Sequence, residues 1–301
     1  MLTSDRVQFN LPNLGRLGRS HTLVDMHFHS IYSDGRNPID KIADRARRLG
    51  IGIAITDHNE IRGALEIDRH SDILTIPGIE LTAAEGSHLL AYFYETKELQ
   101  RFFEVEVVPR MGHGVMSSLS LNMYDIIERA QAYQCLIVFA HPYCAMYTGV
   151  CNLQFSDEQR HLLFQMVDGV EVLNANNLNR WNLRCAILGF NLGKAMTGGS
   201  DGHCLNHMGR AVTFADCPGT RYDFLDAVAL QHSRVIGKEV PFLRKVTANS
   251  LKLRSNLSNC PDLLEKNIRY GRKVINFKSR ALRRRIEHHI NADRLKSYLG
   301  M

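Results

Sequence analysis

Short apolar runs alternate with amphipathic stretches along most of the chain. The apolar runs cover residues 22–26, 51–56, 74–79, 89–94, 136–140, 169–173 and 195–197, and each has the length of a buried strand. This alternation is typical of α/β proteins whose strands form a mostly parallel sheet or barrel. Seven candidate strands favour a barrel.

The stretches between these runs have helical spacing. Apolar residues recur every three or four positions in residues 38–49 and again in residues 124–133. Asn37 is a suitable N-cap, and Pro38 then occupies the first helical position, where proline is favoured. We therefore predict a helix after the first strand and another before the fifth.

Charge divides the 301-residue chain into an acidic body and a basic end. The net charge is +6, but residues 1–233 hold 20 Lys+Arg and 26 Asp+Glu, whereas residues 234–301 hold 17 and 5. From Pro261 onward, apolar residues at spacings of four and seven predict an amphipathic helix with Arg283, Arg284 and Arg285 on its basic face.

We predict an N-terminal extension (1–21), a barrel domain (22–240) and a basic helical extension (241–301). Three interpretations of the basic extension stay open. Its apolar face packs on the barrel, or its cations attract nucleic acid, or they bind an anionic membrane surface or acidic partner.

Composition excludes several classes of protein. Hydrophobic residues make up 45% of the chain and charged residues 23%, so a disordered chain is excluded. No apolar run approaches the roughly 20 residues that cross a bilayer, and the N-terminus does not resemble a secretory signal. Seven scattered cysteines without a Cys-x-x-Cys pair indicate reduced thiols. We expect a cytoplasmic protein.

Metal-ligand residue types fall at the ends of the predicted strands, where functional loops gather in parallel barrels. The first strand continues into Asp-x-His-x-His at 25–29, and His27 and His29, two apart on an extended segment, point to the same side. Asp34 follows on a Ser-Asp-Gly turn. The other candidate ligands are His58, Glu80, His88, His141, Asp201 and His203.

Each of these residues alone is more often structural, because a single histidine at a strand end commonly serves only in hydrogen bonding and a lone Ser-Asp-Gly commonly forms a turn. Together, nine candidate ligands from six regions share one architectural position. This conjunction predicts a polynuclear metal centre.

The ordered motifs resemble the polymerase and histidinol phosphatase (PHP) domain family. The match spans residues 22 to about 215 and comprises Asp-x-His-x-His at 25–29, Ser-Asp-Gly at 33–35, Thr-Asp-His at 56–58, Gly-Ile-Glu at 78–80, Ala-His-Pro at 140–142 and Ser-Asp-x-His at 200–203. The resemblance implies a distorted (β/α)7 barrel with up to three divalent ions at the carboxyl-terminal ends of the strands.

The resemblance also implies how the ligands divide among the ions. One ion would take His27, His29, Glu80 and Asp201, a second would take Glu80, His88 and His141, and a third would take Asp34, His58 and His203. Glu80 would bridge the first two ions, and Glu80, Asp201 and His203 would act in catalysis. Aspartate at position 34, where some relatives carry histidine, resembles the branch of small phosphoesterases that act on nucleotides or short nucleic acids.

Such a centre suits phosphate-ester hydrolysis by a hydroxide that bridges two cations. Mixed His and carboxylate ligands favour Zn²⁺, Mn²⁺ or Fe²⁺. Asp25 and Asp57 either accept imidazole N–H groups in a second layer or make ordinary turn bonds. Arg62, Arg210 and Asn176 are candidate substrate contacts, with ordinary surface or loop roles as the alternative.

We therefore expect a metal-dependent phosphoesterase that hydrolyses a small phosphorylated substrate. A phosphomonoester in a nucleotide or at an oligonucleotide end is favoured. The alternatives are a nuclease, a phosphoprotein phosphatase or a non-catalytic PHP scaffold that the metal ions stabilise.

Overall fold

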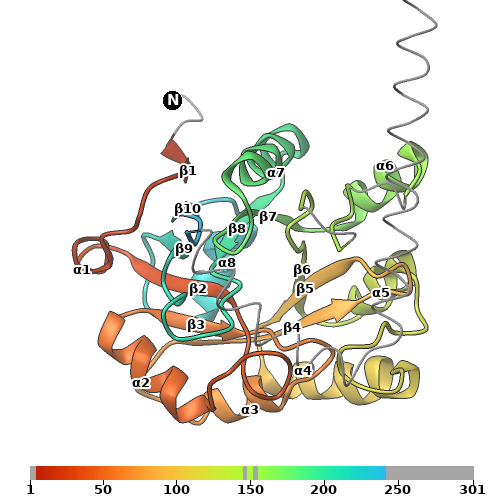
Figure 1. The fold of residues 1–301 in the computed structure, drawn as a ribbon, viewed down its shortest axis with the longest axis horizontal. Helices are drawn as coiled ribbons and strands as arrows, with labels where there is room; N and C mark the ends of the chain where they lie inside the picture. The colour runs from red at the N-terminus through yellow and green to blue at the C-terminus, as the bar shows by residue number, and fades with distance from the viewer. Residues whose placement is uncertain (1–4, 145–147, 152–154, 242–301) are drawn as a thin grey trace, which may run out of the picture. The chain divides into compact units, whose positions relative to one another are not determined.

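The computed structural model of the chain describes residues 5–144, 148–151 and 155–241, all within the unit Met1–Cys260. Ten strands among these residues form one curled sheet in the order β1-β10-β9-β2-β3-β4-β5-β6-β7-β8 (Figure 1). They are β1 (Val7–Gln8), β2 (Thr22–Phe28), β3 (Gly52–Ile55), β4 (Thr75–Thr82), β5 (His88–Phe93), β6 (Cys135–Phe139), β7 (Gly169–Asn174), β8 (Ala195–Gly199), β9 (Ala211–Ala215) and β10 (Arg234–Gly237).

The helices of the described residues follow the strands along the chain. They are α1 (Leu14–Leu17), α2 (Ile39–Leu49), α3 (Arg62–Ile67), α4 (Thr96–Phe102), α5 (Met123–Ala130), α6 (Asp157–Met166), α7 (Asn179–Leu192) and α8 (Arg221–Ala229), with a π-helical turn at Phe103–Val107 and a 3₁₀ turn at Val108–Arg110. The predicted helix at 38–49 is α2, but Pro38 is its cap residue and Asn37 lies outside it, so the predicted cap was wrong by one position.

The predicted α/β architecture is present, but the sheet is a curled half-barrel with three more strands than expected. Each of the seven predicted strands overlaps one of β2 to β8. The missed strands are β1, β9 and β10, and β9 runs antiparallel to both β2 and β10. β1 pairs in parallel with β10, so the segment expected as an N-terminal extension contributes a strand.

The curl brings β8, at one end of the strand order, back against β2 and β9. The hydroxyl of Thr213 on β9 accepts the N–H of Gly198 on β8 at 2.8 Å and donates to its carbonyl at 3.0 Å. Beyond the strand ends, the backbone N–H of His29 donates to the carbonyl of Gly202 at 3.0 Å. The Thr213 hydroxyl and an isolated parallel bridge between Phe28 and Gly202 therefore join the two sides of the half-barrel, although β8 forms no ladder with β2 or β9.

The sheet is mixed, which matters for the direction of β5. β5 is antiparallel to both β4 and β6, and His88, its first residue, pairs with Thr82 at the end of β4. The start of β5 therefore lies at the same edge as the carboxyl-terminal ends of the parallel strands. We call this edge the ligand edge.

An apolar core fills the inside of the curled sheet. Met26, Leu90 and Tyr92 belong to it, together with Phe224 from α8. At the start of α8, Arg221 donates from Nε to the carbonyl of Thr75, the first residue of β4, at 2.9 Å. α8 therefore lies at the edge opposite the ligand edge.

No helix in the described ranges combines the length and apolar character that crossing a bilayer requires. The predicted basic extension, apart from Pro241, lies outside the described residues, and so do Arg283, Arg284 and Arg285.

Candidate metal centre

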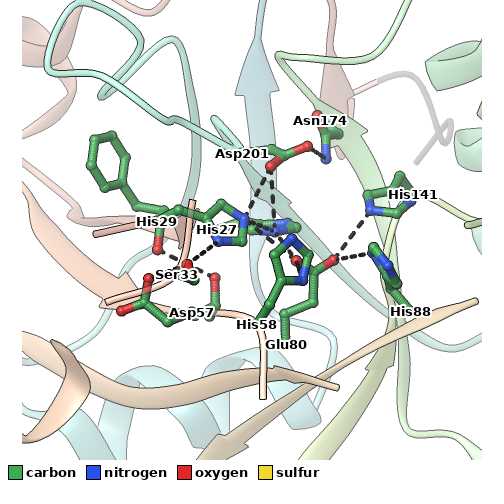
Figure 2. Close-up of polar contacts among 12 residues, drawn as sticks. His27, His29, Ser33, Asp57, His58, Glu80, His88, His141, Asn174 and Asp201 are labelled. Carbon is green, nitrogen blue, oxygen red and sulfur yellow. Dashed lines mark hydrogen bonds and ion pairs between the residues drawn. The ribbon is translucent and has the colours of Figure 1, made fainter. Parts of the chain in front are cut away.

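The nine side chains proposed as ligands from the sequence meet at the ligand edge (Figure 2). His27 lies in β2 and His29 just after it, Asp34 lies on the following turn, His58 follows β3, Glu80 lies in β4, His88 opens β5, His141 follows β6, and Asp201 and His203 follow β8. All except Asp34 and Asp201 are at most 9% exposed as whole residues, and the side chains of those two are 4% and 15% exposed.

The first group of donor atoms centres on His27 and His29. The Nε2 atoms of His27 and His29 are 3.1 Å apart. Asp201 Oδ1 lies 3.6 Å from the first nitrogen and 3.2 Å from the second, and Glu80 Oε2 lies 3.3 and 3.4 Å from them. Ligand atoms about 2.0–2.2 Å from one transition-metal ion stand about 3.0–3.6 Å apart, so this spacing fits one ion.

The second group takes the other oxygen of Glu80. Glu80 Oε1 lies 2.9 Å from His88 Nδ1 and 3.2 Å from His141 Nε2. The two oxygens of one buried carboxylate thus face two different sets of imidazoles. Figure 2 shows this arrangement, with Glu80 between His27 and His29 on one side and His88 and His141 on the other.

The third group surrounds Asp34. Its Oδ1 lies 3.1 Å from His203 Nε2 and 3.9 Å from His58 Nε2. His203 Nδ1 lies 2.9 Å from the carbonyl oxygen of Asp201, which can only accept, so that nitrogen carries the proton and a neutral ring presents Nε2 as a ligand atom. His29 Nδ1 lies 3.7 Å from Asp34 Oδ1, so His29 stands between the first and third groups.

The orientation of His58 favours a cation over a direct hydrogen bond. His58 Nδ1 lies 3.2 Å from Glu80 Oε2, yet this buried nitrogen has no hydrogen-bond partner among the described residues. Because these two atoms lie close together without forming a hydrogen bond, both can face one cation. The donor set of imidazoles and carboxylates suits Zn²⁺, Mn²⁺ or Fe²⁺.

Nearby imidazoles favour the ionised form of the Glu80 carboxylate at this edge. Burial opposes charge on Glu80, but His58, His88 and His27 hold its pKa well below the usual range. Burial likewise opposes charge on His27, but Glu171, Glu80 and Asp201 raise its pKa well above the usual value. Without cations, protonated histidine would neutralise these carboxylates.

His58 behaves differently from His27. Burial lowers its pKa to about 3, and Glu80 and Asp34 offset this only in part. A histidine that stays neutral at ordinary pH keeps a lone pair available to a metal ion. His58 is therefore a candidate ligand at which metal ions need not compete with protons.

Two candidate ligands have a left-handed backbone, which is uncommon outside glycine. φ is +29° at His141 and +48° at Asp201. Such conformations cost of order 1–3 kcal/mol each and persist where the surrounding structure imposes them. Here the turn after each strand redirects the chain so that the side chain faces the centre.

The carboxylates beside the ligand histidines make backbone and serine contacts. Asp25 accepts the N–H groups of Ser200 at 2.8 Å and Gly209 at 2.9 Å, and burial raises its pKa to about 6 despite these bonds. Asp57 accepts the N–H of Ser30 at 2.8 Å and its hydroxyl at 2.6 Å. The partners lie 27 to 184 positions away along the chain, so these are not local turn bonds, and they join the segments that carry the candidate ligands.

The carboxylate that does contact a ligand imidazole is Glu171, which the sequence analysis did not select. Its Oε1 lies 2.9 Å from His27 Nδ1, and its Oε2 accepts the backbone N–H of His141 at 2.8 Å. Asn174 donates from Nδ2 to Glu171 Oε2 at 3.0 Å and to Asp201 Oδ2 at 3.2 Å. A charged residue inside an otherwise apolar strand was the available signal.

The three predicted substrate contacts lie in different surroundings. Arg62 is 62% exposed and pairs with Glu60 Oε2 at 2.7 Å. Arg210 donates from Nη2 to the carbonyl of Glu239 at 2.9 Å. The N–H of Asn176 donates to Asn174 Oδ1 at 2.9 Å, which places Asn176 next to a residue that contacts Asp201. Asn176 is thereby linked to the centre through Asn174.

Comparison with protein families identifies the segment that carries this geometry. A model of the PHP domain family matches residues 25–178, slightly more than half of the chain, and a model of the PHP-associated family matches residues 179–230. The two matched segments are contiguous and together include all nine candidate ligands. No curated protein matches the chain.

Solved structures share the fold at low identity. The lesion-specific endonuclease PfuEndoQ from Pyrococcus furiosus matches with a TM-score of 0.59 at 18% identity, over 71% of this chain and 57% of that one. An endonuclease Q complex with a 27-mer duplex bearing an abasic lesion at the active site gives 0.57 at 17% identity, over 73% and 60%. A two-domain protein from Bacteroides vulgatus containing a predicted PHP-like metal-dependent phosphoesterase gives 0.53 at 19% identity, over 81% and 73%.

Proposed function

The chain belongs to the PHP domain family, and from this premise we propose that it is a phosphoesterase that works with up to three divalent ions. The observation that carries the proposal is the position of Glu80. Its Oε2 lies within 3.4 Å of the Nε2 atoms of His27 and His29, and its Oε1 lies within 3.2 Å of the ring nitrogens of His88 and His141. A carboxylate with a pair of histidines at each of its two oxygens is an arrangement that can hold two ions side by side.

When bound, Zn²⁺, Mn²⁺ or Fe²⁺ would lower the pKa of a coordinated water and stabilise charge on phosphate oxygens. The residues of the chain keep the donors in place. Asn174 orients Asp201 by donating to its Oδ2, so that Oδ1 faces His27 and His29. The Asp201 carbonyl orients the ring of His203. We assign Glu80, Asp201 and His203 to the side of the centre where the reacting phosphate binds.

We propose a phosphomonoester as the substrate, in a nucleotide or at an oligonucleotide end. Asp34 supports this choice, because aspartate there resembles small phosphoesterases that act on nucleotides. A nuclease is the second candidate. The fold likeness to endonuclease Q, one structure of which holds a DNA duplex, favours it over a phosphoprotein phosphatase.

A metal-content measurement combined with a substrate screen tests the proposal. The full chain is loaded with Mn²⁺ and offered nucleoside monophosphates, oligonucleotides phosphorylated at either end, unphosphorylated oligonucleotides and phosphopeptides. We expect phosphate release from the first two classes, and we expect a His27→Ala/His29→Ala double variant to lose both metal and turnover. Cleavage of unphosphorylated oligonucleotides would support the nuclease instead. A loaded protein without any turnover would be a scaffold.

A further inference from the structure

Four side chains near the ligand edge stack on one another and play no part in the candidate metal centre. The guanidinium of Arg180 lies 5.3 Å from the ring of Trp181. The guanidinium of Arg184 lies 5.2 Å from the same ring and 5.0 Å from the ring of Tyr143. We call these four residues the Arg–aromatic ladder. Three of them belong to the first two turns of α7, which runs beside β7 (Figure 1).

A short chain of hydrogen bonds joins the ladder to the metal centre. Tyr143 follows the candidate ligand His141 by two positions, and its carbonyl accepts Asn177 Nδ2 at 2.7 Å. The N–H of Asn177 donates to Asn174 Oδ1 at 3.1 Å, and Asn174 Nδ2 contacts Asp201 at 3.2 Å. The ladder therefore stands at the rim of the centre, on the side of β7 and β8.

The charge of α7 differs from that of its surroundings. Residues 1–233 have a net charge of −6, yet α7 contains two arginines and no carboxylate, whereas α2, α5, α6 and α8 each contain at least two. Arg180 and Arg184 are exposed, and neither makes an ion pair within the described ranges. Several other arginines are engaged by carboxylates, such as Arg129 by Glu106 at 2.9 Å.

We infer that the Arg–aromatic ladder binds single-stranded nucleic acid next to the metal centre. Two unpaired guanidinium groups neutralise backbone phosphates, and the rings of Trp181 and Tyr143 hold them in position and offer a surface on which a base stacks. This inference rests on the proposed function for the chemical class of the substrate, and it specifies that the substrate extends beyond the scissile phosphate.

The composition of the chain supplies a local reporter for the test, because Trp181 is its only tryptophan. The full chain, with its metal ions, is titrated with a short oligothymidylate that has phosphorothioate linkages. We expect a saturable change in Trp181 fluorescence that weakens as salt rises. Arg180→Gln and Arg184→Gln should each weaken binding by about tenfold, the cost of a hydrogen bond to a charged group. Each should also lower the slope of log affinity against log salt by about 0.7.

Arg48→Gln is the matched control. Arg48 is exposed near the carboxyl-terminal end of α2, which lies at the edge opposite the metal centre, and the variant should match the wild type in affinity and salt slope. Equal affinity and slope for all three variants would overturn the inference. A change in Trp181 fluorescence with inorganic phosphate alone would also overturn it. So would oligonucleotide binding, measured by fluorescence anisotropy of a labelled oligonucleotide, that leaves Trp181 fluorescence unchanged.

Two further outcomes separate this inference from others. A fluorescence change on diluting the protein, without a response to oligonucleotide, would mean that the ladder lies in a self-association interface and would overturn the inference. Ladder-dependent binding by a protein that hydrolyses no phosphate ester would support the inference and overturn the proposed function. Phosphate release by a protein whose ladder variants bind oligonucleotide normally would support the proposed function and overturn the inference.

Discussion

Nδ1 of His27 lies 2.9 Å from Oε1 of Glu171, and both side chains are buried. An ionised carboxylate can only accept, so Nδ1 carries the proton and Nε2 faces the other donor atoms of the first group. The second oxygen of Glu171 accepts the backbone N–H of His141 at 2.8 Å. One side chain of β7 thus orients a donor in each of two groups, and Glu171 acts on the centre through its ligands.

Glu171→Gln should weaken metal binding by about 10–100-fold, the usual effect of losing a partner that orients a ligand histidine. Glutamine offers one acceptor where the carboxylate offers two, so it cannot satisfy both His27 and His141. The affinity is measured by competition with a chelator. Asp168→Asn is the matched control, because Asp168 directly precedes β7 at the opposite edge and accepts the N–H of Ile137 at 2.8 Å. Asp168→Asn should lower the free energy of unfolding and leave metal affinity unchanged. Equal metal affinities for the two variants would show that Glu171 does not orient the ligands.

Glu80→Gln and His88→Ala should differ in the number of ions lost. Both oxygens of Glu80 face imidazole groups, so its amide variant should disturb two ions together. His88 contacts only Oε1, at 2.9 Å, and its removal should release one ion. Elemental analysis of the purified variants gives ions per chain. Equal losses in the two variants would contradict a bridging role for Glu80.

The convergence of the nine candidate ligands was more predictable than the frame that carries them. His27 and His29 were accessible to sequence analysis because residues two apart on a strand share a face, and their Nε2 atoms lie 3.1 Å apart. Glu171 was missed because a single charge between Val170 and Val172 has no ligand spacing of its own. Only long-range packing shows that its partner comes from β2.

Strand direction was the second gap in the prediction. Apolar periodicity marks a strand but does not tell which way it runs, so the antiparallel β5 could not be distinguished from a parallel strand. Nor could short runs such as β10 (Arg234–Gly237) be distinguished from loops. The seven-strand expectation followed from the missed short strands alone, because β5 is one of the seven.

Metal ions should stabilise the protein more at higher pH. In the metal-free protein, burial opposes protonation of His27 and His29, but neighbouring carboxylates raise their pKa above the usual value of about 6.5. The folded state then binds more protons than the unfolded state as pH rises through that value. This contribution to stability is present below the unfolded pKa and is lost as pH rises through the folded pKa.

The metal-loaded protein should respond in the opposite sense, because its ligand imidazoles are neutral and metal binding releases protons. The rise in unfolding temperature caused by Mn²⁺ should therefore grow between about pH 6 and pH 8. Differential scanning fluorimetry with and without a chelator measures it. His161→Gln, at a histidine near the middle of α6 and outside the centre, should leave the trend unchanged. If the rise in unfolding temperature caused by Mn²⁺ is constant with pH, protons and metal ions do not compete for these histidines.

Gly199 sets how closely β8 approaches β2, and Gly199→Ala should therefore weaken both the fold and the centre. A Cβ at this position would lie 2.4 Å from the backbone nitrogen of His27 and 2.5 Å from its Cβ, closer than such atoms approach in proteins. The strands would have to separate, at a cost of about 1–3 kcal/mol in the free energy of unfolding. Asp201 follows two residues later, so its Oδ1 would move away from the Nε2 atoms of His27 and His29.

Chemical denaturation and chelator competition on the same variant separate the two effects. Gly219→Ala is the control, since an added Cβ there has no heavy atom within 4 Å. Its stability should change by no more than about 0.5 kcal/mol, the range of ordinary surface substitutions, with unchanged metal affinity. Because the close approach at Gly199 and the first donor group share His27, Gly199→Ala should lose stability and metal affinity together. Lower stability with normal metal affinity would show that Asp201 reaches the histidines without this strand contact.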